Sequence, residues 1–296
     1  MDRTIVILAG GISSRMRKAL SVPLNPRLRR EAEELSKSMI GVGEGFRPFL
    51  DYVLFNVREA GYRDVVIVIG ERDNSIREYY GKAERGNEVF GLSVSYAIQR
   101  IPLGRGKPLG TADALLQALG AAPQWRGRKF TVCNSDNLYS VEALRLMLAS
   151  EDPGAMIDYD RAALEFDQAM IEQFAVTRVS ARGFLVDILE KPHAGAMTQS
   201  QDGSGRIGVS MNLFRLSYDL VLPFLESVPL HPLRLEKELP AAIQMMVRKY
   251  PESVRAIPMA EHVPDLTSQS DIPRVQEYLR RTFPPFTFEA RPARSR

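Results

Sequence analysis

A glycine-rich segment near the amino terminus has the composition of a phosphate-binding loop. Residues 8–16 have the sequence Leu-Ala-Gly-Gly-Ile-Ser-Ser-Arg-Met and follow a β-branched run that predicts a buried strand. Small residues let backbone N–H groups approach phosphate oxygens, and Arg15 supplies a positive charge. A tight strand-to-helix turn with a solvated arginine would have the same composition. The residues expected to contact a nucleotide here are Leu8, Ala9, Gly10 and Gly11.

A second candidate is an aspartate that follows another strand-like run. Residues 129–134 form a strand-like run with apolar Phe130, Val132 and Cys133, and they lead into Asn-Ser-Asp-Asn at 134–137. In α/β sheets, a carboxylate at the carboxyl end of a strand projects into the ligand crevice. Mg²⁺ prefers oxygen ligands, commonly one or two carboxylates together with substrate phosphates and water. Asp136 is therefore predicted to bind Mg²⁺, although an aspartate at this position could instead cap the following helix.

Strand-like and helix-like segments alternate through the first half of the chain, and they must position these residues. Apolar runs at 4–8, 64–70 and 129–134 predict buried strands, and segments 49–60 and 111–119 have helical spacing. Such alternation favours a mainly parallel sheet covered by helices on both faces. We therefore expect a Rossmann-like three-layer α/β/α fold with a mixed, mainly parallel central sheet.

The second half of the chain and one early segment are less regular. Residues 174–179 and 184–189 resemble a strand pair, and residues 209–215 resemble one further strand. We expect a helix directly after the glycine-rich loop. Residues 18–36 interrupt this pattern with two prolines and a charged run, which predicts an inserted loop that contains a short solvated helix.

Bulk composition excludes several classes of protein. The 296 residues carry a formal net charge of only +3, with three arginines in the last six positions, so nucleic acid is not an expected partner. No run approaches the roughly 18 apolar residues of a membrane span, so we expect a cytoplasmic protein without membrane attachment. Cys133 is the single cysteine, and the three histidines are scattered, so any metal should have oxygen ligands.

The glycine-rich segment resembles the opening of the sugar-phosphate nucleotidyltransferases, Leu-Ala-Gly-Gly-x-Gly-Thr/Ser-Arg-Met/Leu. Ser13 stands where that family has a third glycine, as in the related molybdenum-cofactor nucleotidyltransferases. The phosphate-binding lysine of the family then corresponds to Lys37 in Ser-Lys-Ser-Met-Ile-Gly, displaced by the insertion. The resemblance extends over nearly the whole chain and implies a GT-A-like nucleotidyltransferase fold.

The resemblance also implies a binding site for the base. Gln99 ends a strand-like run where family members use a glutamine to hydrogen-bond the base, and Pro-Leu-Gly-Thr-Ala at 108–112 resembles the loop that closes over it. Gly110 and Thr111 would begin a helix, whose first N–H groups suit a nucleotide. Because a glutamine amide both donates and accepts hydrogen bonds, UTP or dTTP is expected. A lone glutamine at a strand end is, however, more often only a surface residue.

The residues that would hold the acceptor follow in the second half. Glu190 and Lys191 begin a Glu-Lys-Pro segment that matches the family's, in which the glutamate contacts the sugar and the lysine contacts its phosphate. Gly208 and Asn212 lie in a segment that resembles the lining of the sugar pocket. We expect one domain over residues 1–288.

The division of this domain also follows from the resemblance. Residues 1–140 would form the nucleotide-binding half, residues 141–288 the acceptor-binding half, and residues 289–296 a mobile tail. Asp265, in His-Val-Pro-Asp-Leu-Thr at 262–267, corresponds to the family's second metal ligand beside Asp136. An aspartate could act as a cap here too, but neighbouring residues can take that role.

The resemblance implies an Mg²⁺-dependent reaction between a nucleoside triphosphate and a sugar 1-phosphate. An acceptor phosphate oxygen would attack the α-phosphorus in line, and pyrophosphate would leave. This oxygen is already ionised near neutral pH, so no general base is required. Arg15 would steady the pyrophosphate, Lys37 the transferring group and Lys191 the attacking phosphate.

Three alternatives stay open from the sequence alone. The acceptor could carry another phosphorylated group, or the chain could be a nucleotide-sensing regulatory homologue without turnover. A glycosyltransferase would explain Asp-Tyr-Asp at 158–160 as a metal motif, but it leaves the glycine-rich loop and the Glu-Lys-Pro segment unexplained. The oligomeric state is not determined, and a homo-oligomer is compatible with the sequence.

Overall fold

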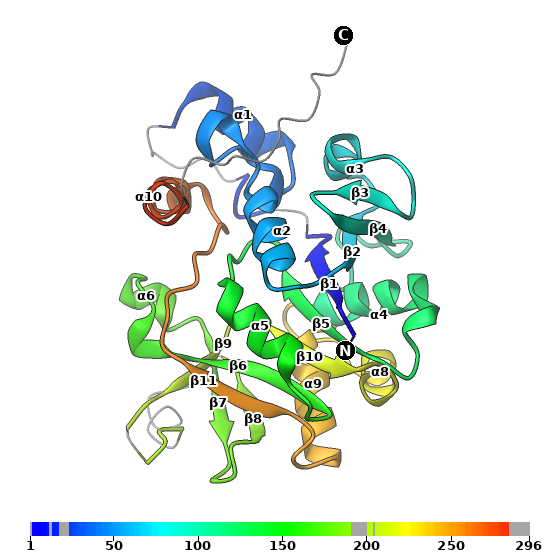
Figure 1. The fold of residues 1–296 in the computed structure, drawn as a ribbon, viewed down its shortest axis with the longest axis vertical. Coiled ribbons are helices and arrows are strands. Elements are labelled where there is room, and N and C mark those ends of the chain that lie inside the picture. The colour runs from blue at the N-terminus through cyan, green and yellow to red at the C-terminus, as the bar shows by residue number, and fades with distance from the viewer. Residues whose placement is uncertain (1, 12–13, 18–23, 191–199, 204, 284–296) are drawn as a thin grey trace.

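The computed structural model describes residues 2–11, 14–17, 24–190, 200–203 and 205–283, and these build one eleven-stranded mixed sheet (Figure 1). The strand order is β3-β4-β2-β1-β5-β10-β6-β9-β7-β8, with β11 beside β6. The strands are β1 (Thr4–Ala9), β2 (Asp64–Gly70), β3 (Asn87–Val89), β4 (Leu92–Gln99), β5 (Lys129–Asn134), β6 (Gly154–Asp160), β7 (Ala175–Val179), β8 (Leu185–Leu189), β9 (Gly208–Ser210), β10 (Phe214–Ser217) and β11 (Arg255–Met259).

The centre of the sheet is parallel. β1 pairs with β2 and with β5 in parallel, and β2 pairs in parallel with β4. Every residue of β1 is buried, because helices cover both faces of these strands, and this explains its continuous apolar sequence. All four strands end at the same edge of the sheet. This edge therefore collects the residues that follow each strand.

Helices form a layer on each face of the sheet and enclose two separate hydrophobic cores (Figure 1). One core contains buried side chains of α1, α2, α3, α5 and α10, and the other contains those of α4, α8 and α9. The three-layer α/β/α prediction is confirmed. The helices are α1 (Pro26–Glu34), α2 (Phe49–Glu59), α3 (Ser75–Tyr80), α4 (Thr111–Ala121), α5 (Val141–Ala149), α6 (Gln168–Ile171), α8 (Tyr218–Ser227), α9 (Leu239–Lys249) and α10 (Ile272–Thr282).

Two predicted elements differ from the structure. The single strand expected over 209–215 is two strands, β9 and β10, separated where Asn212 adopts a φ of 57°. Asparagine is one of the few residues that tolerates this left-handed conformation, so the chain turns there and β10 enters the sheet between β5 and β6. The helix expected directly after the glycine-rich loop is not found in residues 14–17, which form a turn.

The inserted segment contains the short helix that its sequence predicts. α1 begins after Asn25, whose side chain accepts a hydrogen bond from the backbone N–H of Arg27, and it buries Leu28 and Ala32. The helix is fixed to the segment that follows it, because the Oε2 atom of Glu31 accepts a hydrogen bond of 2.8 Å from the backbone N–H of Gly41. The insertion therefore packs against the molecule beside the segment that carries the predicted catalytic lysine.

The sheet passes through both predicted halves of the domain. β10 belongs to the second half of the chain, yet it pairs with β5 of the first half and with β6. The functional division at residue 140 stays a prediction, and the predicted tail at 289–296 lies outside the described residues.

Among the described helices, none has the length and apolar character that crossing a membrane requires.

Candidate active site

A cleft of about 310 Å³ lies at the carboxyl edge of the parallel strands. It is formed by the residues that follow β1 and β5, by the end of β4 and by the start of α4. The predicted nucleotide-binding and catalytic residues that line it are Leu8, Ala9, Gly10, Gly11, Arg15, Lys37, Gln99, Gly110, Thr111 and Asp136. The structure thus brings together residues that are up to 128 positions apart in the sequence. Asp265 lines a neighbouring cavity rather than this cleft.

The glycine-rich loop passes close to the end of β4 at Gly10 and is open at Gly11. A Cβ atom on Gly10 would lie 2.7 Å from the Oε1 atom of Gln99, so a glycine lets the two strand ends approach. A Cβ atom on Gly11 would meet nothing within 4 Å, which leaves the backbone open to the cleft. Arg15 is exposed at the margin. These features suit a loop that binds phosphate through backbone N–H groups.

Gln99 holds the loop that precedes α4. Its side chain is only 2% exposed, and its Nε2 atom donates hydrogen bonds of 2.8 Å to the backbone oxygen of Gly110 and of 2.8 Å to the Oδ2 atom of Asp113. Gly110 has a φ of +106°, and a Cβ atom there would lie 2.6 Å from the backbone oxygen of Lys237. Both amide hydrogens of Gln99 therefore serve the protein itself. Its predicted contact with the base stays a prediction.

Thr111 begins α4 and connects it to α9. Its Oγ1 atom accepts a hydrogen bond of 2.9 Å from the backbone N–H of Leu239, the first residue of α9. The backbone N–H of Ala112 donates to the backbone oxygen of Lys237 over 3.0 Å. The loop at Gly110 is thus fixed from two directions.

Lys37 and Asp136 meet in the cleft. Lys37 lies directly after α1, Asp136 directly after β5, and the Nζ atom of Lys37 forms an ion pair with the Oδ2 atom of Asp136. The two side chains are 19% and 15% exposed, so the pair is largely shielded but opens to the cleft. The hydroxyl group of Thr267 also lies 3.4 Å from the Oδ2 atom of Asp136. A cation and an anion are therefore held at the predicted transfer site.

Asp265 is carried to Asp136 by backbone pairing. The backbone N–H of Leu266 donates to the backbone oxygen of Asp136 over 2.8 Å, and that of Leu138 donates to Pro264 over 2.9 Å. Asn137 donates a hydrogen bond of 3.1 Å to the Oδ2 atom of Asp265. The two predicted metal ligands therefore lie on segments that are joined directly.

The second carboxylate oxygen of Asp265 has an unusual environment. The Oδ1 atom is buried and has no hydrogen-bond partner among the described residues. Burial, together with the negative charge of Asp136, raises the pKa of Asp265 to about 7. A buried, unpaired carboxylate oxygen beside a second carboxylate is costly unless a cation is present. The donor set therefore fits Mg²⁺, which takes oxygen ligands of this kind.

The predicted acceptor residues are not gathered in the cleft. Glu190 is exposed at the end of β8, and Lys191 lies outside the described residues. A Cβ atom on Gly208 would lie 2.0 Å from the Oδ1 atom of Asp158, so this glycine makes room for a buried carboxylate. Asn212 forms the turn between β9 and β10. Backbone geometry explains both Gly208 and Asn212, and their contact with a sugar stays a prediction.

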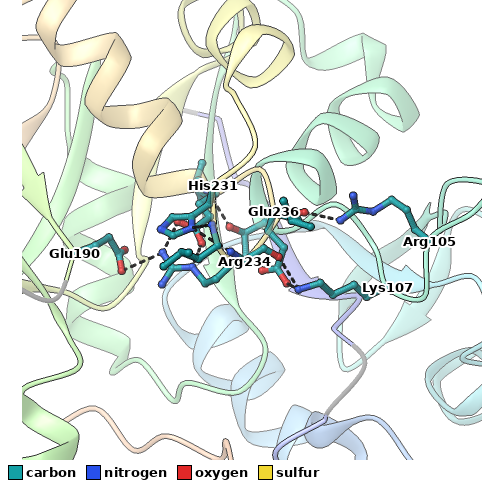
Figure 2. Close-up of polar contacts among 11 residues, drawn as sticks. Arg105, Lys107, Glu190, His231, Arg234 and Glu236 are labelled. Atoms are coloured by element: carbon teal, nitrogen blue, oxygen red, sulfur yellow. Dashed lines mark hydrogen bonds and ion pairs between the residues drawn. The ribbon is translucent and has the colours of Figure 1, made fainter.

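A loop that no sequence pattern indicated connects the two predicted substrate regions. Residues 231–238, called the 231–238 loop below, extend from Glu190 on one side to Arg105 and Lys107 on the other (Figure 2). Lys107 donates a hydrogen bond of 2.7 Å to the backbone oxygen of Arg234 and pairs with Glu236 over 2.6 Å. Lys107 and Glu236 both line the cleft.

Arg234 is the central side chain of the 231–238 loop. It forms a bidentate ion pair with Glu238, and its Nη2 atom lies 3.7 Å from the Oε2 atom of Glu190 (Figure 2). His231 shapes the turn, because its Nδ1 atom accepts hydrogen bonds of 3.2 Å from the backbone N–H groups of Leu233 and Arg234. The charged run that precedes α9 was the available signal, but it does not indicate these partners.

This fold and cleft define a nucleotide-dependent transferase, and comparison with known proteins gives its family. The model of the nucleotidyl transferase family matches residues 4–250, so the chain belongs to that family. The UTP-bound UGPase from Acinetobacter baumannii has a solved structure with a TM-score of 0.68 and 19% sequence identity, and the match covers 94% of this chain and 93% of that one. The two chains share the same fold.

Curated relatives match part of the chain. The bifunctional protein GlmU of Symbiobacterium thermophilum is 29% identical over 171 residues, which are 52% of this chain and 29% of that protein. The D-glycero-alpha-D-manno-heptose 1-phosphate guanylyltransferase of Aneurinibacillus thermoaerophilus is 26% identical over 141 residues, which are 48% of this chain and 49% of that protein. The matched part therefore spans less than half the length of each of these relatives.

Proposed function

We propose that this chain is a sugar-1-phosphate nucleotidyltransferase that converts a nucleoside triphosphate and a sugar 1-phosphate into a nucleoside diphosphate sugar and pyrophosphate. The observation that carries the proposal is the meeting of the glycine-rich loop, Lys37 and the Asp136–Asp265 pair at one edge of the sheet. Family membership and the names of relatives, which include a heptose 1-phosphate guanylyltransferase and glucose-1-phosphate adenylyltransferases, support the same reaction class.

The residues of the chain would act by positioning and by charge. Gly10 and Gly11 line the cleft, and their backbone N–H groups would bind phosphate oxygens, with Arg15 at the margin to neutralise pyrophosphate. The ammonium group of Lys37 would stabilise the negative charge on the transferring phosphorus. The attacking oxygen belongs to an ionised phosphate, so no side chain needs to remove a proton.

Asp136 and Asp265 would hold Mg²⁺. When bound, the ion would neutralise phosphate charge and orient the α-phosphate for in-line attack. The buried, unpaired Oδ1 atom of Asp265 and its raised pKa support this assignment, because a cation would relieve both. Lys37 already balances the charge of Asp136, so the ionised form of Asp265 would supply the negative charge that attracts the ion.

The expected preference for UTP or dTTP rested on the ability of Gln99 to donate and accept. In the structure its amide hydrogens are engaged by Gly110 and Asp113, so the side chain can offer a base only its oxygen. The preference for UTP or dTTP therefore stays a prediction, now resting on the Gln99 oxygen alone. The nucleotide has to be identified by measuring pyrophosphate release with each nucleoside triphosphate.

The test is pyrophosphate release with Mg²⁺, each nucleoside triphosphate in turn and a panel of sugar 1-phosphates. Asp136→Ala should abolish release, whereas Asp64→Ala should not, because Asp64 is exposed at the opposite end of β2. Release that needs one triphosphate, one acceptor and Asp136 supports the proposal. Nucleotide binding without turnover on any sugar 1-phosphate would favour another phosphorylated acceptor or a sensor protein.

A further inference from the structure

Exposed leucines gather on two neighbouring loops of the molecule. They are Leu103, Leu230, Leu233 and Leu235, and among the described residues no other leucine is exposed. Leu103 is fully exposed, and Leu233 is 87% exposed. Single apolar side chains on a surface are ordinary, but a group of them at one place marks an interaction site. The two loops therefore form a surface that a partner would cover.

Contacts between the two loops join the leucines into one surface. Arg105 follows Leu103 by two positions, and its Nη2 atom donates a hydrogen bond to the backbone oxygen of Leu235. Lys107 pairs with Glu236 over 2.6 Å, and Figure 2 shows both basic side chains reaching from one loop to the other. Lys107 and Glu236 also line the cleft. The surface is therefore part of the rim of the cleft.

Both loops are tight turns that hold their leucines outward. Leu103 occupies the turn 102–105, in which the last residue donates a backbone hydrogen bond of 3.0 Å to the first and Gly104 has a φ of 82°. Leu235 has a φ of 55°, a left-handed conformation that is unfavourable for a bulky residue. Its backbone N–H donates to the backbone oxygen of His231 over 2.8 Å, which holds this conformation. Strain that is held in this way points to a functional conformation.

Positive charge accompanies the leucines. Segments 98–109 and 228–238 contain five lysine and arginine residues but only two glutamates. These glutamates are already paired, Glu236 with Lys107 and Glu238 with Arg234. The cations of the two segments that have no carboxylate partner among the described residues are Arg100, Arg105 and Lys237. The surface therefore keeps an excess of positive charge.

Two further carboxylates border this surface without neutralising it. The Nζ atom of Lys237 donates to the backbone oxygen of Glu226 over 3.0 Å and not to its carboxylate. Glu71 accepts a hydrogen bond of 3.1 Å from the backbone N–H of Ile101, and Arg72 lies 4.0 Å from its other oxygen. The cations still outnumber the carboxylates when both glutamates are counted.

We propose that this surface binds a lipid bilayer that contains anionic phospholipids. The docking surface, as it is called below, consists of Leu103, Leu230, Leu233, Leu235, Arg100, Arg105 and Lys237. Leucine side chains would enter the boundary between head groups and acyl chains, and the cations would bind lipid phosphates. The expected absence of membrane attachment rested on spanning segments alone, and a docking surface does not need one.

Shape and charge together favour a bilayer over other partners. The leucines project from the tips of turns, and acyl chains surround such side chains without a matching pocket. A second copy of the chain across a two-fold axis would bring the same unpaired cations against one another. Nucleic acid would match the cations but leave the leucines against phosphates. An anionic bilayer accommodates both kinds of side chain.

The first experiment is sedimentation of the whole protein with lipid vesicles. We expect partition onto vesicles of equal parts phosphatidylcholine and phosphatidylglycerol to exceed partition onto phosphatidylcholine alone at least about 10-fold, and to fall as salt is added. Equal partition onto both kinds of vesicle would contradict the role of charge. Absence of binding to either would overturn the proposal.

The second experiment removes the leucines. Leu103→Ser combined with Leu233→Ser should lower partition onto the mixed vesicles at least about 10-fold. The matched control is Val179→Ser combined with Val186→Ser, which removes exposed aliphatic surface from β7 and β8 and should leave partition unchanged. Circular dichroism checks that both variants are folded. An equal loss in the two double variants, or no loss in the first, would overturn the proposal.

The third experiment tests the charges and the strongest alternative partner. Arg100→Gln should weaken binding to the mixed vesicles about 5-fold. Arg30→Gln, at an exposed position of α1, should leave it unchanged. Sedimentation equilibrium without lipid gives the mass of the protein in solution. A dimer that Leu103→Ser with Leu233→Ser dissociates, without vesicle binding by the unaltered protein, would assign the surface to a second copy and overturn the proposal.

Discussion

The two halves of the molecule present different chemistry to their ligands. In the nucleotide half, the loop after β1 exposes backbone at Gly10 and Gly11, and the only ion pair described at its phosphate end is Lys37–Asp136. In the acceptor half, charged side chains are paired with one another, as in Arg234 with Glu238 and Arg206 with Asp158. Backbone recognition suits a triphosphate, which is the same in every nucleotide. Side-chain pairs are easier to exchange, and they suit an acceptor that varies between relatives.

Removal of the second predicted metal ligand should have the largest effect. Asp265→Asn keeps the size of the side chain but removes the charge, and we expect kcat to fall about 10²–10³-fold because phosphate charge is no longer neutralised. Steady-state pyrophosphate release at saturating Mg²⁺ measures this change. Asp64→Asn is the matched control at the other end of the sheet. A loss below about 5-fold would contradict the assignment of Asp265.

A substitution at Gly110 should destabilise the predicted nucleotide-binding half. Gly110→Ala places a Cβ atom 2.6 Å from the backbone oxygen of Lys237 at a φ of +106°, so we expect a loss of about 2–3 kcal/mol in the free energy of unfolding. Gly120→Ala is the control, because nothing lies within 4 Å of its Cβ position and alanine favours its helix by about 1 kcal/mol. Urea denaturation measures both. Equal stability of the two variants would show that the loop at Gly110 adapts freely.

The stability of the protein without Mg²⁺ should depend on pH through Asp265. Its pKa is raised to about 7 in the folded state from 3.8 in an unfolded chain, so the folded state binds the extra proton. The contribution of this proton is fully present below about pH 3.8 and is lost as the pH rises from there to about 7, by up to about 1.4 kcal/mol per pH unit.

Denaturation between about pH 4.5 and pH 7 would measure this slope, with and without excess Mg²⁺. Binding of the ion should remove the slope, because it favours the ionised carboxylate. Asp265→Asn should remove it as well. A slope that persists in this variant would assign the titration to another group.

The smallest expected effect is a change in the KM for the acceptor when Arg234 is replaced. Arg234→Ala leaves Glu238 and Glu190 without their guanidinium partner, and we expect the KM for the acceptor to rise about 5–10-fold while the KM for the nucleotide stays constant. Arg248→Ala, which removes an ion pair between the exposed Arg248 side chain and Asp187 of β8, should change neither value. An equal rise of both KM values would instead show that the 231–238 loop supports the nucleotide.

The nucleotide half is the part that the sequence predicts well. β2 has the predicted bounds, because a continuous apolar run with clear ends is typical of a parallel strand buried on both faces, and β5 also spans the predicted residues. Lys37 and Asp136 are 99 positions apart, yet each follows an element that ends at the same edge of the sheet. The strand pattern predicted the place of Asp136, whereas Lys37 was predicted only from the resemblance to the sugar-phosphate nucleotidyltransferases.

The acceptor half and the hydrogen bonds within the site could not be predicted in this way. β6 is buried along nearly its whole length and β11 is short, so neither shows an alternating pattern. Lys107 and Glu236 pair across 129 positions without any shared periodicity. Gln99 could be placed near the base from the resemblance, but the partners of its amide hydrogens depend on Asp113 and the turn at Gly110.

The position of β10 has a consequence for folding and for dissection of the chain. Phe214 and Leu216 pair with Val132 and Phe130, so β5 completes its hydrogen bonds only after more than 200 residues have been synthesised. Until then β5 is an apolar strand with an open edge, which can pair with another chain. A fragment that ends near residue 140 should therefore aggregate, and refolding of the whole chain should be slow because these contacts are distant in sequence. The predicted nucleotide-binding and acceptor-binding halves therefore have to fold as one unit.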